Sequence, residues 1–104
     1  MMRHLGVLRG SGVVECAGEA IGRADYELDG YLMRPGEITA SGEVRMKAAE
    51  LAKAFGRRNL VLRTDDGRQL AIFFSPRRVA ASSDAAHVDV RGGLPDLKEW
   101  PRGR

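Results

Sequence analysis

A strict alternation of apolar and polar residues over 38–46 is the feature that most limits how this chain can fold. Successive side chains of a strand point to opposite faces, so a period of two predicts a strand with one buried face. The segment 23–32 alternates in the same way, with Ala24, Tyr26 and Leu28 on one face. These two segments predict a sheet that packs one face onto a core.

The spacing of the apolar residues changes directly after residue 46. Ala48, Leu51, Ala52 and Phe55 follow the i, i+3, i+4, i+7 spacing of an amphipathic helix, and Gly56 supplies a stop signal. A helix of about two and a half turns is unstable alone, so its apolar face must pack on the rest of the domain. We therefore expect one short helix after residue 46.

Three further segments read as strands. Residues 59–75 carry Asp66-Gly67 between two β-rich runs, which is a strong hairpin signal. The glycine-broken segment 5–16 predicts either one long, bent strand or two short ones, and 87–91 predicts a last short strand. We expect 95–104, with two prolines and little periodicity, to be a loosely ordered tail.

The predicted fold class is α+β and predominantly antiparallel β, a small barrel or roll of five to six strands. One short helix lies between strands three and four, an element order that resembles the OB-fold by analogy only, because fold does not imply function. At 104 residues, we expect 1–104 to form a single small β-barrel-like domain.

Composition indicates a protein of the reducing cytoplasm. Cys16 is the single cysteine, so no disulfide can form within the chain. No stretch has the length of a membrane span, and no apolar signal segment opens the chain, so we expect a soluble protein without a membrane partner. The net charge of +3 comes from 17 basic and 14 acidic residues spread along the chain, so the protein has only a weak overall electrostatic field.

Few residues are candidates for catalysis or metal binding. Cys16 ends an apolar strand and reads as a small buried hydrophobe, and His4 and His87 stand outside any triad or zinc-ligand spacing. Asp25, Glu27 and Asp29 could serve a small-ligand enzyme, but a solvated strand face with cross-strand partners such as Arg9 or Arg23 explains them more simply. We expect no catalytic residues, no metal site and no cofactor.

Two features remain as candidate binding surfaces. Adjacent residues of a strand point to opposite faces, so either Phe73 or Phe74 should lie outside the core, where a second copy or another protein could cover it. Two arginine pairs could instead form a surface for single-stranded nucleic acid beside exposed aromatics, and these are Arg57, Arg58, Arg77 and Arg78. We therefore expect a non-catalytic binding or protein-interaction module, with a homodimer as one form of it and an OB-like nucleic-acid binding protein as the alternative.

Overall fold

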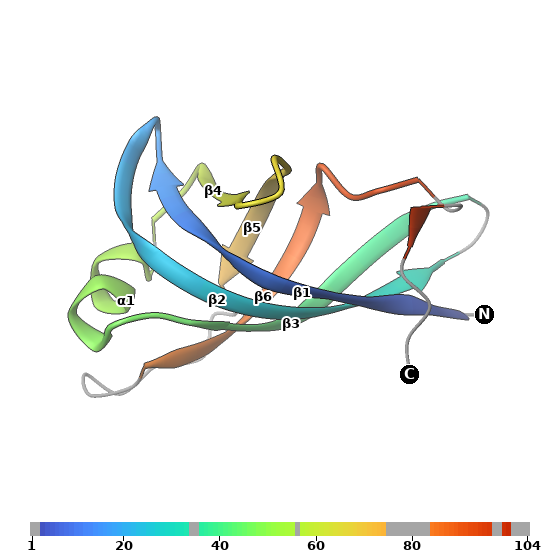
Figure 1. The fold of residues 1–104 in the computed structure, drawn as a ribbon, viewed down its shortest axis with the longest axis horizontal. Helices are drawn as coiled ribbons and strands as arrows, with labels where there is room; N and C mark the ends of the chain where they lie inside the picture. Colours follow the sequence, from blue (N-terminus) through green and yellow to red (C-terminus); the bar gives the residue numbers. More distant parts are fainter. Residues whose placement is uncertain (1–2, 34–35, 56, 75–83, 97–98, 101–104) are drawn as a thin grey trace.

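In the part of the chain that the structure describes, six antiparallel strands close into a barrel in the order β1-β2-β3-β6-β5-β4 (Figure 1). The structure, a computed structural model, describes residues 3–33, 36–55, 57–74, 84–96 and 99–100. The predicted class is confirmed, including the helix between the third and fourth strands. The elements are β1 (Arg3–Cys16), β2 (Glu19–Leu32), β3 (Ile38–Arg45), α1 (Ala48–Ala54), β4 (Leu60–Thr64), β5 (Gln69–Phe74) and β6 (Ala85–Gly92).

The β1–β2 hairpin is the largest unit of the barrel, with 14 residues in each strand. Its two-residue turn, Ala17-Gly18, has φ values of 52° and 88°, and positive φ at both positions matches the twist of the flanking strands. The segment 5–16, which the sequence left open as one strand or two, is thus part of one continuous strand. Its second half also pairs with β4, from Gly12 to Cys16, and this ladder closes the barrel.

Two glycines allow neighbouring strands to approach unusually closely. A Cβ on Gly12 would lie less than 3.0 Å from backbone atoms of β4, and a Cβ on Gly42 would lie equally close to backbone atoms of β2. Each glycine follows a serine, Ser11 or Ser41, in short segments that are faintly alike. The strands can therefore coil tightly at these points only because no side chain is present.

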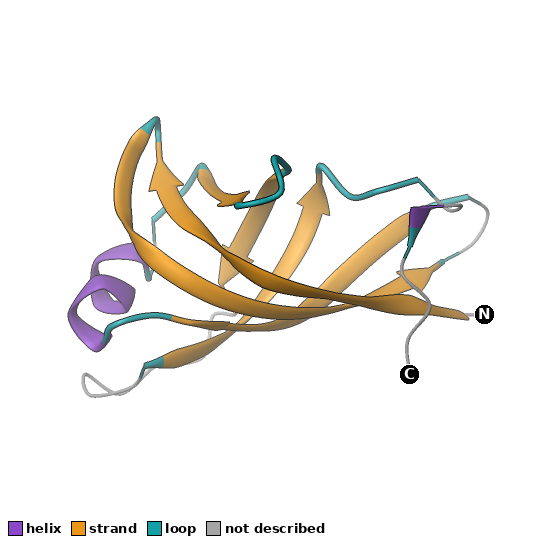
Figure 2. Cartoon of the chain, viewed as in Figure 1, coloured by secondary structure: helices purple, strands orange, loops and turns teal. Residues whose placement is uncertain are grey.

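The core lies inside the barrel and under the helix, and it is almost entirely aliphatic. Leu51 and Ala54 are the buried residues of α1, which covers the end of the barrel opposite the start of β1 (Figure 2). Val88 and Val90 of β6 face inward as predicted, although this strand is longer than the predicted 87–91. The largest fully buried side chains are Leu28, Leu51, Leu62, Leu70, Ile72, Val14, Val44, Val88 and Val90.

Trp100 closes the other end of the core. Its side chain is only 6% exposed, and its indole occupies the space that a Cβ on Gly30 would need. The indole Nε1–H donates a hydrogen bond of 3.1 Å to the carbonyl oxygen of Pro95. Most of the predicted loose tail, 97–98 and 101–104, lies outside the described residues, but Trp100 itself packs onto the barrel.

Candidate functional site

Phe73 lies on the outer face of β5 and is 46% exposed. The Cα of Phe73 pairs with Asp89 of β6, and the guanidinium carbon of Arg91 lies 5.2 Å from the centre of the Phe73 ring. Such a cation–π contact stabilises an exposed ring by about 0.5–1 kcal/mol. We call these three residues together with Ala71 and Val61, which pair across β4 and β5, the Phe73 patch.

Phe74 points the other way. It is half-buried, packs against the core, and its ring centre lies 6.0 Å from that of Phe55, which follows α1. The alternation of the strand therefore separates the two phenylalanines that the sequence singled out together, and Phe73 is the one that faces outward. Phe74 anchors the end of β5 to the helix side of the core.

The two arginine pairs cannot be placed together. Arg57 and Arg58 follow α1 and are both exposed. The Arg57 Nε–H donates to the carbonyl oxygen of Lys53 at 2.6 Å, and the Arg58 carbonyl accepts the Cys16 thiol at 3.3 Å. Arg77 and Arg78 lie outside the described residues, so a surface built from all four arginines stays a prediction.

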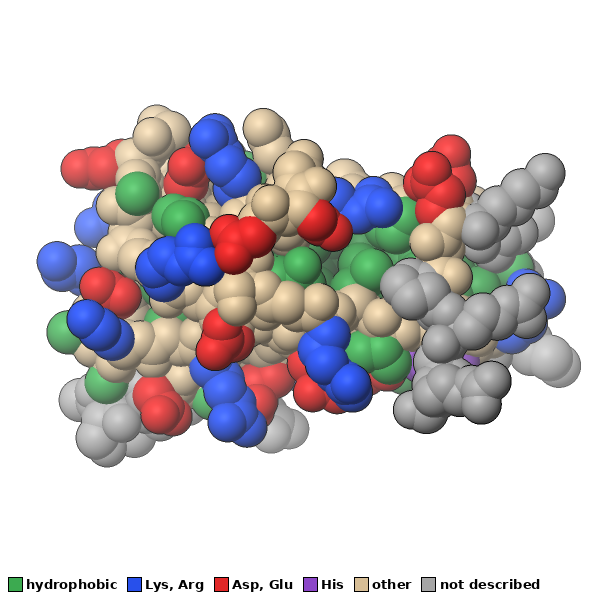
Figure 3. All heavy atoms as spheres, viewed as in Figure 1, with side chains coloured by type: hydrophobic (Ala, Val, Ile, Leu, Met, Phe, Trp, Pro, Cys, Tyr) green, Lys and Arg blue, Asp and Glu red, His purple; other side chains and the backbone are tan. Residues whose placement is uncertain are grey.

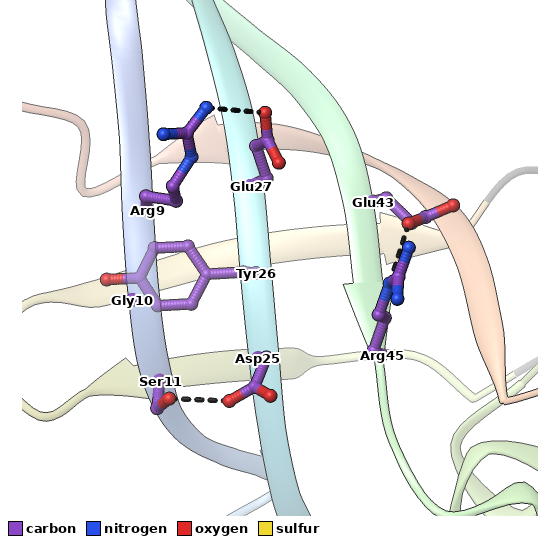
Figure 4. Close-up of a pocket in the computed structure, with 8 residues that line it drawn as sticks. All are labelled: Arg9, Gly10, Ser11, Asp25, Tyr26, Glu27, Glu43 and Arg45. Atoms are coloured by element: carbon purple, nitrogen blue, oxygen red, sulfur yellow. Dashed lines mark hydrogen bonds and ion pairs between the residues drawn. The ribbon is translucent and has the colours of Figure 1, made fainter.

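Charged side chains follow the outer faces of β1, β2 and β3 and line a hollow of about 450 Å³ (Figure 4). The strand register sets Arg9, Glu27, Glu43 and His87 in one row across four strands. Glu27 lies directly opposite Glu43, an arrangement that like charges disfavour. Arg9 bonds Glu27 at 2.9 Å and Arg45 bonds Glu43 at 3.0 Å, so each carboxylate has its own cation.

The three carboxylates that the sequence suggested as candidate enzyme residues also have hydrogen-bond partners. Asp25 accepts the Ser11 hydroxyl at 2.5 Å, Glu27 accepts Arg9, and Asp29 contacts His4 at 2.9 Å. The prediction that Arg9 acts as a cross-strand partner is confirmed, whereas Arg23 bonds Asp65 instead. Among the residues that the structure describes, no group of three or more His, Cys, Asp or Glu side chains is arranged to hold a metal ion.

Tyr26 joins this surface to the interior. Its Cα pairs with Gly10, and its hydroxyl and ring carbons fill the space where a side chain at Gly10 would lie. Burial, and secondarily the carboxylate of Asp66, raises the pKa of the Tyr26 hydroxyl. The ring therefore packs as a neutral group that fills the space beside a glycine, which is a structural role.

Arg23 ties β2 to the β4–β5 turn through two hydrogen bonds to Asp65, of 3.0 and 2.7 Å. Hydrogen bonding from Arg23 lowers the pKa of Asp65, so this pair stabilises the fold above the ordinary carboxyl pKa, and that stabilisation fades as the pH falls through the lowered value. We expect Arg23→Ala to return the Asp65 pKa to its ordinary range in a carbon-detected NMR titration. Arg63→Ala is the matched control, because Arg63 contacts Glu15, and an Asp65 titration that is identical in all three proteins would contradict the assignment.

Sequence reasoning found Phe73 but missed its setting. Asp89 and Arg91 flank the ring because β5 and β6 pair in one particular register, which includes an irregularity between Ala71 and Ile72. No local pattern encodes that register. The alternation of apolar and polar residues along β6 could have predicted that Asp89 and Arg91 share its outer face.

Comparison of the chain with protein-family models, with curated proteins and with solved structures gives no match. In the part of the chain that the structure describes, no helix combines the length and the apolar character needed to cross a membrane.

Proposed function

We propose that this protein is a non-catalytic interaction module that associates with a second copy of itself through the Phe73 patch. The observation that carries the proposal is the exposure of Phe73. Among the described residues, Phe73 and Met33 are the large hydrophobic side chains exposed by more than a third, and Phe73 alone of these two lies within a strand.

The charges around Phe73 favour a second copy as the partner. Asp89 and Arg91 have opposite charge and lie on the same face of β6, next to the aromatic ring. In a two-fold symmetric dimer each residue meets the reciprocal surface, so Asp89 of one copy can face Arg91 of the other. A patch that carries a positive and a negative charge around an apolar centre is therefore complementary to a second copy of itself.

The nucleic-acid alternative draws on the element order shared with OB-fold barrels and on the exposed Arg57 and Arg58. The charges on β1, β2 and β3 weigh against it, because Arg9 and Arg45 are already paired with Glu27 and Glu43 and leave no excess of positive charge for phosphates on this face. We expect labelled single-stranded DNA and RNA to show no salt-sensitive change in fluorescence anisotropy. Salt-sensitive binding that is lost in Arg57→Ala/Arg58→Ala would favour the alternative.

Solution mass tests the dimer. We expect a mass of about twice 11.4 kDa by light scattering. Phe73→Ser should weaken the dimer about thirtyfold or more, because truncation of a central aromatic commonly costs about 2 kcal/mol or more of binding free energy. Met33→Ser is the matched control, since Met33 is exposed to a comparable degree but lies outside the patch, and it should leave the mass unchanged.

A charge exchange tests the arrangement itself. Asp89→Arg and Arg91→Asp should each weaken the dimer, and the double variant should restore it, because the two opposite charges are then exchanged rather than lost. A monomeric mass for the unaltered protein at millimolar concentration would overturn the proposed function.

A further inference from the structure

The two edges of β1 differ in how far they are paired. One edge pairs with β2 from Arg3 to Cys16, whereas the other pairs with β4 only from Gly12 to Cys16. β4 ends at Thr64 and turns away into β5 (Figure 1). No strand of the described structure therefore pairs with the second edge of β1 over residues 3–10.

The direction of the unpaired backbone groups follows from one hydrogen bond. The Asp65 N–H donates to the carbonyl oxygen of Ser11 at 2.9 Å, so the backbone groups of Ser11 point to the β4 side. Backbone groups of successive strand residues point alternately to the two edges, so those of Arg9 and Val7 also point away from β2. Their N–H and C=O groups line an edge that continues the β1–β4 ladder.

The surroundings of this edge suit an extended chain. The β4–β5 turn lies at one end of this edge, where Asp65 bonds Ser11, and Figure 3 shows apolar surface in a recess near the middle of the face that it draws. On the inner side of β1, Leu8 lies between Gly6 and Gly10, and Tyr26 packs beside Gly10. Inward-pointing side chains of an added strand would therefore find apolar neighbours in Leu8 and in the Tyr26 ring.

We propose that the free edge of β1 binds an extended segment of a partner protein by β-strand addition. The segment runs antiparallel to β1 in line with β4, and it forms hydrogen bonds with the backbone of Val7 and Arg9. It carries apolar residues at alternate positions, which face the recess, and an acidic residue beside Arg9 on the outer face. This edge is separate from the Phe73 patch, so the inference stands or falls independently of the proposed dimer.

Amide hydrogen exchange measured by NMR tests the proposal directly. The probe is a synthetic peptide of about eight residues in which valine alternates with threonine and one threonine is replaced by glutamate. In excess peptide we expect exchange of the Val7 and Arg9 amides to slow about tenfold or more, while the Leu8 amide, which faces β2, serves as the internal control. The same peptide with alternate amides N-methylated should give no protection, because it cannot pair.

Two variants separate backbone pairing from charge recognition. Val7→Pro removes an N–H that points to the free edge and should abolish binding, with its fold checked by circular dichroism. Arg9→Glu keeps the backbone intact, and it should weaken binding of the glutamate peptide and favour a matched lysine peptide. Unchanged exchange at Val7 and Arg9 in millimolar peptide would overturn the proposal, and so would protection that rises with protein concentration alone, because it would assign the edge to a second copy.

Discussion

Gly42→Ala is expected to lower the free energy of unfolding by more than about 3 kcal/mol. The added methyl group would lie less than 3.0 Å from the Glu27 carbonyl oxygen and the Leu28 Cα. Both atoms belong to the backbone of β2, which is held in its ladder with β3 and cannot rotate away. Overpacking that flexible side chains relieve costs about 1–3 kcal/mol, and here the strands themselves must separate. Urea unfolding followed by circular dichroism measures the loss.

Gly92→Ala is the matched control for this prediction. Gly92 also lies in a strand, but a Cβ there would meet the Ala71 Cβ at 3.5 Å, which is an ordinary contact. We expect this variant to change the free energy of unfolding by no more than about 0.5 kcal/mol. Equal urea midpoints for the two variants would show that β2 and β3 tolerate a side chain at residue 42, and would refute the steric account.

The strands and the helix could be predicted because their signals are local. The alternation over 38–46 and the helical spacing from Ala48 to Phe55 follow from which side chains need burial, and each reappears as an element at nearly the same residues. The Asp66-Gly67 hairpin also formed as predicted, with Gly67 at φ 95°. In all three cases the sequence neighbours that carry the signal are also neighbours in space.

The features that could not be predicted from the sequence depend on pairing between strands that are distant in the chain. Gly12 and Gly42 could be seen as glycines within strands, but the carbonyl groups that occupy their side-chain positions come from Arg63 and Glu27 on neighbouring strands. Whether segment 5–16 forms one strand or two was likewise undecided locally, because β4 supports only its second half. Such contacts need the register, and the register is a property of the closed barrel.

The candidate site was also predictable only where its signal is local. The alternation of β5 predicted that one of Phe73 and Phe74 would face outward, since two adjacent strand residues cannot share a face. It could not predict that Arg91 would lie over the ring, or that the β4–β5 turn would contact β1 at Ser11. Functional surfaces of a barrel are assembled across strands, so local patterns identify their members singly and not their grouping.

Trp100→Ala is expected to lower the free energy of unfolding by about 3–5 kcal/mol, the usual cost of truncating a buried tryptophan. The side chain is only 6% exposed and fills the end of the core above Gly30. Its loss would leave a cavity lined by β2 and would also remove the hydrogen bond to Pro95. Because Trp100 is the single tryptophan, the measurement for this variant is urea unfolding by circular dichroism.

Two further variants show whether the effect comes from packing at Gly30. Trp100→Phe keeps an aromatic ring but loses the indole N–H, so it should recover part of the lost stability. Gly30→Ala places a methyl group where the indole ring carbons now lie, so it should expel the indole and shift the tryptophan emission to longer wavelength. If Gly30→Ala left the emission of Trp100 unchanged, the indole would not sit against β2 in solution, and the segment that follows β6 would not close this end of the barrel.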